Sequence, residues 1–311
     1  MIRKSLLTAF ILLLLHALVV YIYPVSSTQY SSQENTIKAQ QFIYGGAHKD
    51  IIIGSSLSNR LVMDSLRGIS NLSFSGNSIF DGLSILNHSG LTPRTVFIET
   101  NIMSRGENVG FTSYVNSPIL NPIKRAIPSL RDEFQPIGMV GEFIIRTLGK
   151  RPAGTHVAQQ AKASEEPRDD AFFKTMLALQ AEDYNEVPDT LILQARFEHL
   201  AREVHRLEAK GARIIFFEMP VNETVCDLPE PQMIRTFYRK YFPENKYAYI
   251  RVPGCAGYQT TDGAHLADNE AARFTRFFKT NADALLTTRK QLPVRSGTPS
   301  SRQTESLPEK N

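Results

Sequence analysis

The sequence has only two cysteines and no tryptophan, and it contains neither a CxxC pair nor a cluster of histidines. A zinc site is built from such paired or clustered ligands, so we expect no metal, and we expect no cofactor either. No basic stripe with interleaved aromatic residues is present, which argues against nucleic-acid binding. The net charge of +4 comes from the two ends of the chain, Arg3 with Lys4 and residues 290–311, so the body is neutral.

One long apolar run lies near the amino terminus. Residues Leu6 to Tyr23 are almost wholly apolar, which is close to the minimum length for a helix that spans a bilayer. Basic residues precede the run and none follows before Lys38, so the positive-inside rule predicts a cytoplasmic amino terminus. We expect an uncleaved signal anchor, with cleavage near Ser27 as the alternative. His16 inside the run is interpreted as a helix contact or a neutral imidazole.

The stretch Asp50–Leu61 reads as a buried strand that ends in small hydroxyl residues. Three isoleucines, Ile51–Ile53, form the β-branched run of a strand covered on both faces. Gly54 permits a tight turn. Ligands of open α/β sheets bind beyond the carboxyl ends of the strands, so a nucleophile is expected among Ser55, Ser56 and Ser58. The alternative is a serine-rich turn that caps a helix beginning near Asn59.

A second polar pair lies more than two hundred residues further along the chain. Asp262 and His265 are three positions apart, just before a helical pattern. A serine hydroxyl needs an imidazole to take its proton, and the imidazole needs a carboxylate to orient it. Asp262 and His265 can fill these two roles, while the alternative is a turn with a surface histidine.

Together these stretches resemble the SGNH, or GDSL-type, family of esterases and acyltransferases. The first family block matches Gly54-Ser55-Ser56-Leu57, with serine where most members have aspartate. The glycine of the second block matches Gly76 in NLSFSGNS, and the asparagine of the third matches Asn101 in TVFIETN. The closing D-x-x-H block matches Asp262 and His265. The resemblance covers about residues 50–279.

The resemblance implies a role for each matched residue. Ser56 is the implied nucleophile, with His265 as the base and Asp262 as the orienting carboxylate. The oxyanion hole is implied to consist of the Ser56 N–H, the Gly76 N–H and the Asn101 side chain, each donor worth about 3 kcal/mol of the barrier. Asn101 has an alternative interpretation as a loop cap that bonds its own backbone.

Predicted strands and helices alternate along the chain. Strands are predicted at 70–75, 95–99 and 212–218, and helices at 61–67, 78–88 and 189–210. This alternation predicts an α/β fold, and the resemblance implies the SGNH-like version of it, with three layers and a doubly wound, mostly parallel sheet.

The chain divides into four predicted parts. Residues 1–27 form the cytoplasmic end and the anchor, 28–48 a juxtamembrane stalk, 49–289 the catalytic domain and 290–311 a disordered tail. Periodicity weakens at about 105–187, which we interpret as an insertion over the carboxyl edge of the sheet that controls access to the site. It contains a charged, alanine-rich tract, Lys150–Asp170, of which Lys162–Asp170 is expected to be mobile in solvent.

The two cysteines, Cys226 and Cys255, lie in the part predicted to be outside the cytoplasm. An oxidising compartment favours a disulfide between them. Closing a loop of about 30 residues would stabilise the fold by roughly 3.6 kcal/mol on the chain-entropy model.

The predicted architecture is similar to that of bacterial envelope acyl-transfer proteins of the DltD and AlgJ type. That resemblance implies a single-pass inner-membrane protein with a periplasmic domain, a cell-envelope polysaccharide as acceptor and a polytopic MBOAT-type acyltransferase as partner. The predicted function is an O-acyltransferase or esterase that uses an acyl-enzyme on Ser56, with acetyl as the expected group. The alternative is a non-catalytic subunit that binds glycan or scaffolds a membrane complex.

Overall fold

The computed structural model describes residues 2–22, 31–46, 49–136, 138–140, 170–252 and 254–288. Its centre is a sheet of five strands in the order β2-β1-β3-β4-β5, and every neighbouring pair is parallel. The strands are β1 (Asp50–Gly54), β2 (Ile69–Ser73), β3 (Thr95–Glu99), β4 (Arg213–Phe217) and β5 (Ala248–Ile250). The predicted α/β class with a mostly parallel sheet is confirmed.

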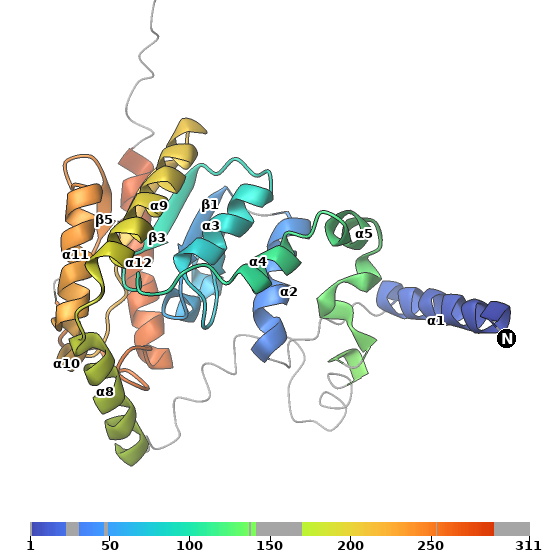
Figure 1. Cartoon of the computed structure of the whole chain (residues 1–311), viewed down its shortest axis with the longest axis horizontal. Helices are drawn as coiled ribbons and strands as arrows, with labels where there is room; N and C mark the ends of the chain where they lie inside the picture. The colour runs from blue at the N-terminus through green and yellow to red at the C-terminus, as the bar shows by residue number, and fades with distance from the viewer. Residues whose placement is uncertain are drawn as a thin grey trace, which may run out of the picture.

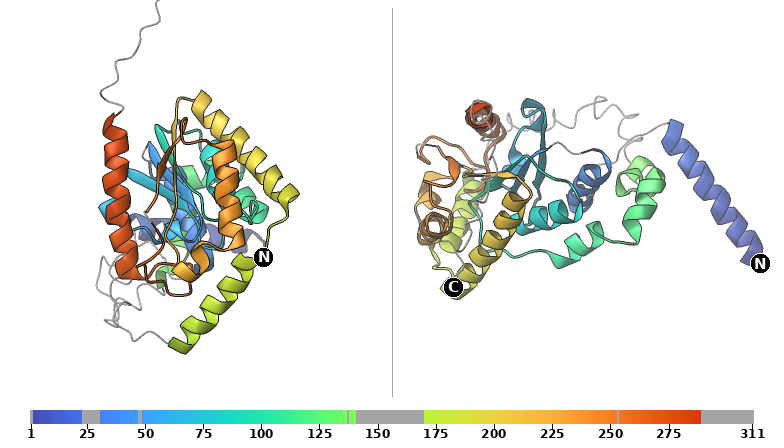
Figure 2. Two further views of the ribbon diagram at one scale, coloured as in Figure 1. Left: turned by 90° about the vertical axis from the view of Figure 1, so that its left-hand side faces the viewer. Right: turned by 90° about the horizontal axis from the view of Figure 1, so that it is seen from above.

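Helices cover both faces of this sheet (Figures 1 and 2). One face carries α2 (Ser31–Tyr44), α3 (Ile79–His88), α9 (Thr190–Ala209) and α11 (Pro229–Tyr241), and the other carries α12 (Asp268–Thr288). Side chains alternate between the faces of a strand, so Ile51 and Ile53 pack toward the first group while Ile52 packs toward α12. The isoleucine run is buried because both faces are covered.

The predicted elements agree with the structure where the sequence shows a clear apolar run or a long helical periodicity. The strand predicted at 95–99 is β3, and the helix predicted at 189–210 is α9, which Asp189 caps through the Leu191 and Ile192 N–H groups. The helix predicted at 61–67 is wrong. Only the 3-10 turns η1 (Ser58–Arg60) and η2 (Met63–Ser65) form there. Between them Val62 is extended, and its N–H bonds the Thr275 hydroxyl of α12 instead of a helical carbonyl.

The apolar run forms helix α1 (Ile2–Ile22), which extends away from the domain (Figure 1). It is long and apolar enough to cross a membrane, as the sequence predicted, and its side chains are mostly exposed. The predicted cleavage position near Ser27 lies outside the described residues, as do residues 290–311. Helix α2 in the predicted stalk packs on the domain through Ile37, Ala39 and Phe42.

The predicted insertion at 105–187 sends its two ends in different directions (Figure 1). The first end forms α4 (Val109–Val115), α5 (Leu120–Ala126), η3 (Pro128–Leu130) and η4 (Asp132–Phe134), and it packs against α2 and α1. The second end forms α8 (Asp170–Asn185), which packs against α11 and the short helix α10 (Glu223–Cys226). Most of the charged tract Lys150–Asp170 lies outside the described residues.

Cys226 and Cys255 form the predicted disulfide, with their Cα atoms 6.2 Å apart. The bond closes a loop 29 residues long in sequence that contains α11 and β5. It therefore ties α10 to the chain that leads from β5 toward Asp262.

Candidate functional site

The predicted site residues meet where the strand order changes direction. Strand β1 lies between β2 and β3, so the crossover from β1 goes one way and the later strands go the other. The carboxyl ends of strands at such a point form the usual binding crevice of open α/β sheets. Ser56 follows β1 and Asn101 follows β3, so both lie at this crevice.

The turn that carries Ser56 is held by Glu99, the last residue of β3, which is fully buried. Its carboxylate accepts hydrogen bonds from the Ser55 N–H at 2.9 Å and the Ser55 hydroxyl at 2.7 Å. It also accepts from the Ser58 N–H at 3.1 Å and the Ser58 hydroxyl at 2.5 Å. Because the residues on both sides are fixed in this way, the backbone of Ser56 is fixed too, and Ser55 and Ser58 are structural.

Gly54 makes this arrangement possible. A Cβ atom placed on Gly54 would lie 1.9 Å from the Ser58 hydroxyl oxygen and 2.5 Å from Glu99 Oε2. Neither can retreat without losing the hydrogen bonds that hold the turn. Only glycine therefore fits between the strand end and the buried carboxylate.

Asp262 shapes the loop that carries His265. Its Oδ1 accepts hydrogen bonds from the Ala264 N–H at 3.0 Å and the His265 N–H at 2.8 Å, which closes a tight turn. The turn is also held by the Thr261 N–H, which donates to the His265 carbonyl at 2.8 Å. The position of the His265 imidazole is therefore fixed by hydrogen bonds between the loop backbone and the Asp262 carboxylate, which belongs to the same loop.

Three side chains form a continuous chain of hydrogen bonds. Ser56 Oγ lies 2.9 Å from His265 Nε2, although the two residues are 209 positions apart in sequence. His265 Nδ1 lies 2.6 Å from Asp262 Oδ2. The predicted contacts from Ser56 to His265 and from His265 to Asp262 are therefore present. The imidazole is 26% exposed, which leaves it open to a ligand.

The Asp262 carboxylate is ionised at neutral pH. Burial acts to raise its pKa, but hydrogen bonds from the His265 ring and backbone outweigh burial and lower the pKa to about 2 from the ordinary 3.8. A negative charge on Oδ2 keeps a proton on Nδ1 and leaves Nε2 free to accept one. The arrangement therefore suits a base that takes the Ser56 proton.

Two potential donors for a developing oxyanion lie near Ser56. The Ser56 N–H has no hydrogen-bond partner among the described residues. The Asn101 amide is clamped to the backbone of Met219, because its Oδ1 accepts from the Met219 N–H at 2.7 Å and its Nδ2 donates to the Met219 carbonyl at 2.8 Å. The clamp fixes the plane of the amide and uses one of the two Nδ2 protons, which leaves one proton for a ligand.

Gly76 lies in the loop after β2, in a turn closed by the Asn77 N–H and the Phe74 carbonyl at 3.2 Å. Its φ of 76° requires glycine, and a Cβ there would meet nothing within 4 Å. Gly76 is not among the described residues that line the cavity beside Ser56. Its predicted role as an oxyanion donor stays a prediction.

A cavity of about 410 Å³ opens beside the three hydrogen-bonded side chains. Ser56, Asn101 and His265 line it from the sheet edge, and Gln180 and Tyr184 line it from α8. The second end of the predicted insertion therefore lines the site, whereas the first end, from α4 to η4, packs against α2 and α1 instead. Control of access by the insertion stays a prediction. Burial raises the pKa of Tyr184, so its phenol stays protonated and can donate a hydrogen bond.

Acidic side chains predominate among the charged residues that line this cavity. Of the described residues, Asp183, Glu186, Asp189 and Glu230 line it together with one Arg or Lys, Arg105. Burial raises the pKa of Glu230, which a hydrogen bond from Ser104 partly offsets. Among the described residues, no group of three or more His, Cys, Asp or Glu side chains is arranged to hold a metal ion.

Glu99 is the site residue that sequence reasoning missed. Its one sequence signal is a charged residue at the end of the apolar run TVFI, where a buried strand otherwise has no reason to carry a carboxylate.

No protein-family model matches the chain, and no curated protein matches it.

Proposed function

We propose that the protein is a membrane-anchored serine O-acyltransferase or esterase of the SGNH type, with Ser56 as nucleophile. The observation that carries the proposal is the chain from Ser56 Oγ through the His265 ring to Asp262, with distances of 2.9 and 2.6 Å. Nucleophile, base and orienting carboxylate meet beside a cavity at the crevice of a parallel sheet, which is the arrangement that acyl transfer needs.

The proposed reaction has two steps. Ser56 Oγ attacks the carbonyl carbon of an acyl ester while His265 Nε2 takes its proton, and the resulting oxyanion accepts hydrogen bonds from the Ser56 N–H and Asn101 Nδ2. The tetrahedral intermediate collapses, the leaving alcohol receives the proton from His265, and the acyl group stays on Ser56. An acceptor hydroxyl then gives its proton to His265 and attacks the carbonyl carbon of the acyl-enzyme. When this second intermediate collapses, the bond from the acyl carbon to Ser56 Oγ breaks and His265 returns the proton to Ser56 Oγ.

The charges of the cavity favour a neutral acceptor. Asp183, Glu186 and Asp189 outnumber Arg105 in the described lining of the cavity, so a polymer that carries carboxylates would be repelled. The hydroxyl groups of a neutral sugar can instead donate hydrogen bonds to these carboxylates. A neutral cell-envelope polysaccharide or glycan is therefore the proposed acceptor, with acetyl as the proposed group.

The proposed setting is the outer face of the inner membrane. Helix α1 would anchor the chain with its amino terminus in the cytoplasm, because Arg3 and Lys4 precede the apolar run. The disulfide fits an oxidising compartment such as the periplasm. An acyl donor made inside the cell must cross the membrane, which a polytopic partner of the MBOAT class would accomplish.

The rival proposal is a non-catalytic subunit that keeps the fold to bind glycan or to scaffold a complex. A serine with no catalytic role needs neither the His265 contact nor the lowered pKa of Asp262. The assembled contacts therefore favour the enzyme.

Labelling with a fluorophosphonate tests the proposal, because this reagent reacts only with activated serines. We expect the full chain in detergent to be labelled, and Ser56→Ala to lose both labelling and hydrolysis of an activated acetyl ester, by at least about 10⁴-fold. Ser55→Ala is the matched control, since Ser55 bonds Glu99 and not His265, and it should still be labelled. Folding of each variant is checked by a cooperative thermal unfolding transition like that of the parent protein. Labelling that persists in Ser56→Ala, or its absence from the folded parent protein, would favour the rival.

A further inference from the structure

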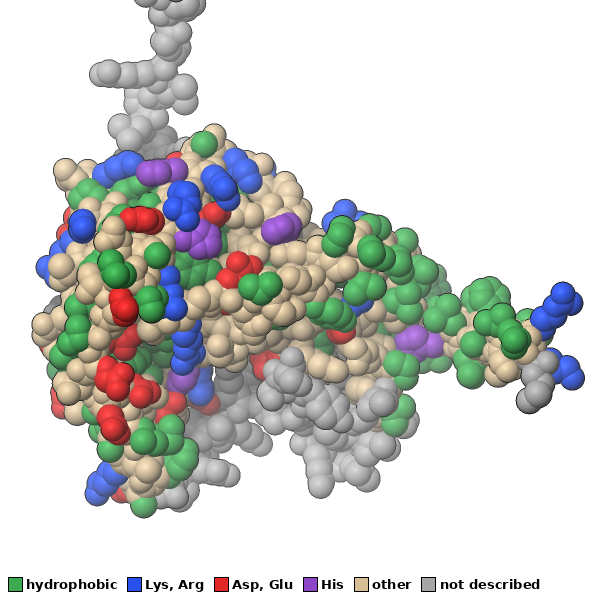
Figure 3. Space-filling view, viewed as in Figure 1, with side chains coloured by type: hydrophobic (Ala, Val, Ile, Leu, Met, Phe, Trp, Pro, Cys, Tyr) green, Lys and Arg blue, Asp and Glu red, His purple; other side chains and the backbone are tan. Residues whose placement is uncertain are grey.

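Helix α5, in the segment from α4 to η4, exposes apolar side chains and buries a charged one, which is the reverse of an ordinary surface helix. Three isoleucines at four-residue spacing, Ile119 just before α5, Ile123 on it and Ile127 just after it, are 72%, 42% and 40% exposed. Positions four apart share one face of a helix, so they form a single apolar stripe that points away from the domain. Figure 3 shows hydrophobic side chains gathered over this part of the molecule and continuing toward α1.

The opposite side of α5 is polar and buried. Lys124 is 8% exposed and pairs with Asp132 at 2.5 Å, and Asn121 accepts a hydrogen bond from the Tyr44 hydroxyl at 2.8 Å. A helix on a water-exposed domain places apolar residues inward and charged residues outward. Because α5 does the reverse, its outward environment is expected to be apolar.

The contact between α1 and η3, the turn that follows α5, shows that the exposed apolar stripe lies beside α1. His16 Nε2 of α1 lies 3.1 Å from the carbonyl oxygen of Ser129 in η3, and the two elements pack together. His16 is six residues before Ile22, the end of α1, which corresponds to about 9 Å along a helix axis. The turn after α5 is therefore level with the outer part of the proposed span, at the depth of about 5–10 Å that interfacial helices reach.

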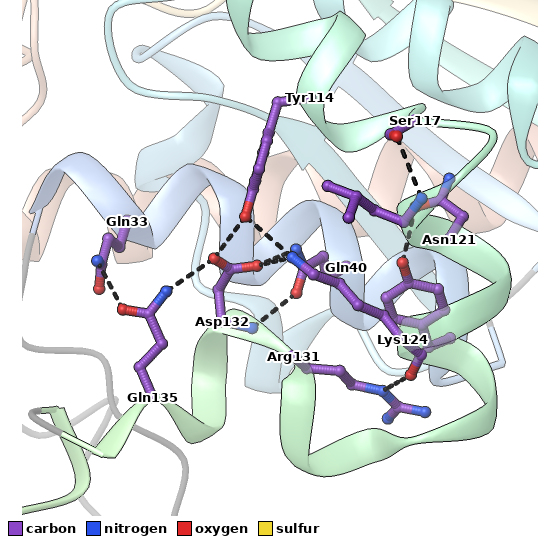
Figure 4. Close-up of polar contacts among 11 residues, drawn as sticks. Gln33, Gln40, Tyr114, Ser117, Asn121, Lys124, Arg131, Asp132 and Gln135 are labelled. Carbon is purple, nitrogen blue, oxygen red and sulfur yellow. Dashed lines mark hydrogen bonds and ion pairs between the residues drawn. The ribbon is translucent and has the colours of Figure 1, made fainter. Parts of the chain in front are cut away.

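A network of hydrogen bonds fixes this segment to α2 (Figure 4). The Asp132 carboxylate lies at its centre and accepts from Lys124, from the Tyr114 hydroxyl at 2.9 Å and from Gln135 at 2.9 Å. Gln40 of α2 bonds Asp132 twice, as donor to the carboxylate and as acceptor from the Asp132 N–H at 3.0 Å. Burial of Asp132 is offset by these donors, so the segment is rigidly attached to the domain.

We propose that α5 lies in the interface of the same bilayer that α1 spans, with Ile119, Ile123 and Ile127 in contact with lipid acyl chains. The occupant is lipid because the stripe continues an apolar helix that is itself long enough to span a bilayer. Exposed Arg125 on α5 can meet lipid phosphates. A span and an interfacial helix together hold the domain in one orientation. This inference does not depend on acyl transfer.

The absence of tryptophan makes the test direct, because any tryptophan that is introduced is the only one in the protein. The full chain carrying Ile123→Trp or Ile119→Trp is reconstituted in vesicles of phosphatidylcholine and phosphatidylglycerol, with and without bromine on the acyl chains. Bromine quenches tryptophan only on contact within the bilayer. The matched control is Leu191→Trp, at an apolar position on α9 that is 77% exposed and lies away from α1.

We expect brominated lipid to quench roughly half or more of the emission from positions 123 and 119, and little of that from position 191. Each variant is first shown to be folded by a cooperative thermal unfolding transition like that of the parent protein. Emission at positions 123 and 119 that brominated lipid leaves unchanged but aqueous iodide quenches would overturn the proposal, since the stripe would face water. Emission shielded from both quenchers would also overturn it, because a second copy of the chain would then cover the stripe.

Discussion

The two sides of the cavity differ in how their hydrogen bonds are assembled. On the nucleophile side, Glu99 holds the Ser56 turn, and Asp262 holds both the backbone and the ring of His265. On the oxyanion side, the Asn101 amide is bound to Met219, and Gly76 lies in a loop outside the cavity lining.

This difference separates two requirements of acyl transfer. The nucleophile and its base belong to the protein itself, so their contact can be seen without a ligand when it is already formed, as it is here. Oxyanion donors are needed only when charge develops in the transition state, and their geometry is defined by an atom that substrate brings. The contacts of Ser56, His265 and Asp262 can therefore be assessed from interatomic distances, whereas the proposed oxyanion donors are assessed from reaction rates of variants.

Among variants that keep Ser56, the largest effect is expected at Asp262. In Asp262→Asn the oxygen can keep the Ala264 and His265 N–H bonds, while the new amide donates to His265 Nδ1. That donation moves the imidazole proton to Nε2, which then cannot take the proton of Ser56. We expect kcat for an activated ester to fall by about 10⁴-fold with little change in fold.

The control for this variant is Asp283→Asn, which removes an exposed carboxylate that pairs with Lys279 on α12. It should leave kcat unchanged. A loss of less than tenfold in Asp262→Asn would contradict the assigned role of the carboxylate, because the tautomer would then not control the rate.

Sequence reasoning succeeds for contacts that neighbouring residues determine. The Ile51–Ile53 run and the strand at 95–99 are recognisable because burial on both faces leaves a continuous apolar signal. The spacing of Asp262 and His265 is also local, because a three-residue turn brings the two together.

Contacts between distant segments are not visible in the same way. Glu99 acts on a turn more than forty residues earlier in the chain, and its one sequence signal, a carboxylate at the end of an apolar run, does not say which distant groups it binds. Strand β5 has only three residues and follows no periodic pattern, so tertiary pairing with β4 defines it. Helix α5 could not be predicted from the sequence, because helix prediction assumes that the apolar face of a helix points toward the core.

An intermediate effect is expected at Asn101, on the oxyanion side. Asn101→Ala removes the remaining Nδ2 proton from the cavity, and we expect kcat to fall by about 10² to 10³-fold with KM nearly unchanged. This split is the signature of a donor used only in the transition state.

A purely structural Asn101 gives a different result. Loss of the Met219 clamp would then lower thermal stability while kcat of the folded protein stayed within a few-fold of the parent, and the donor assignment would fail. Steady-state kinetics and thermal unfolding, measured on the same preparation, distinguish the two roles.

The smallest effect is expected at Gly76, where the sequence placed the third donor. Gly76→Ala keeps the backbone N–H and meets no atom within 4 Å, but a φ of 76° costs a residue with a Cβ about 1 kcal/mol.

Gly68 is the matched control, because its φ is 89°, its surroundings are equally open, and it precedes β2 at the opposite end of the strand from the site. Both alanine variants should lower the melting temperature by a similar few degrees. Only Gly76→Ala should lower kcat, by roughly tenfold, because relaxation of the strained turn would shift the donor. Equal kcat in the two variants would remove Gly76 from the oxyanion side and leave the Ser56 N–H and Asn101 to stabilise the charge.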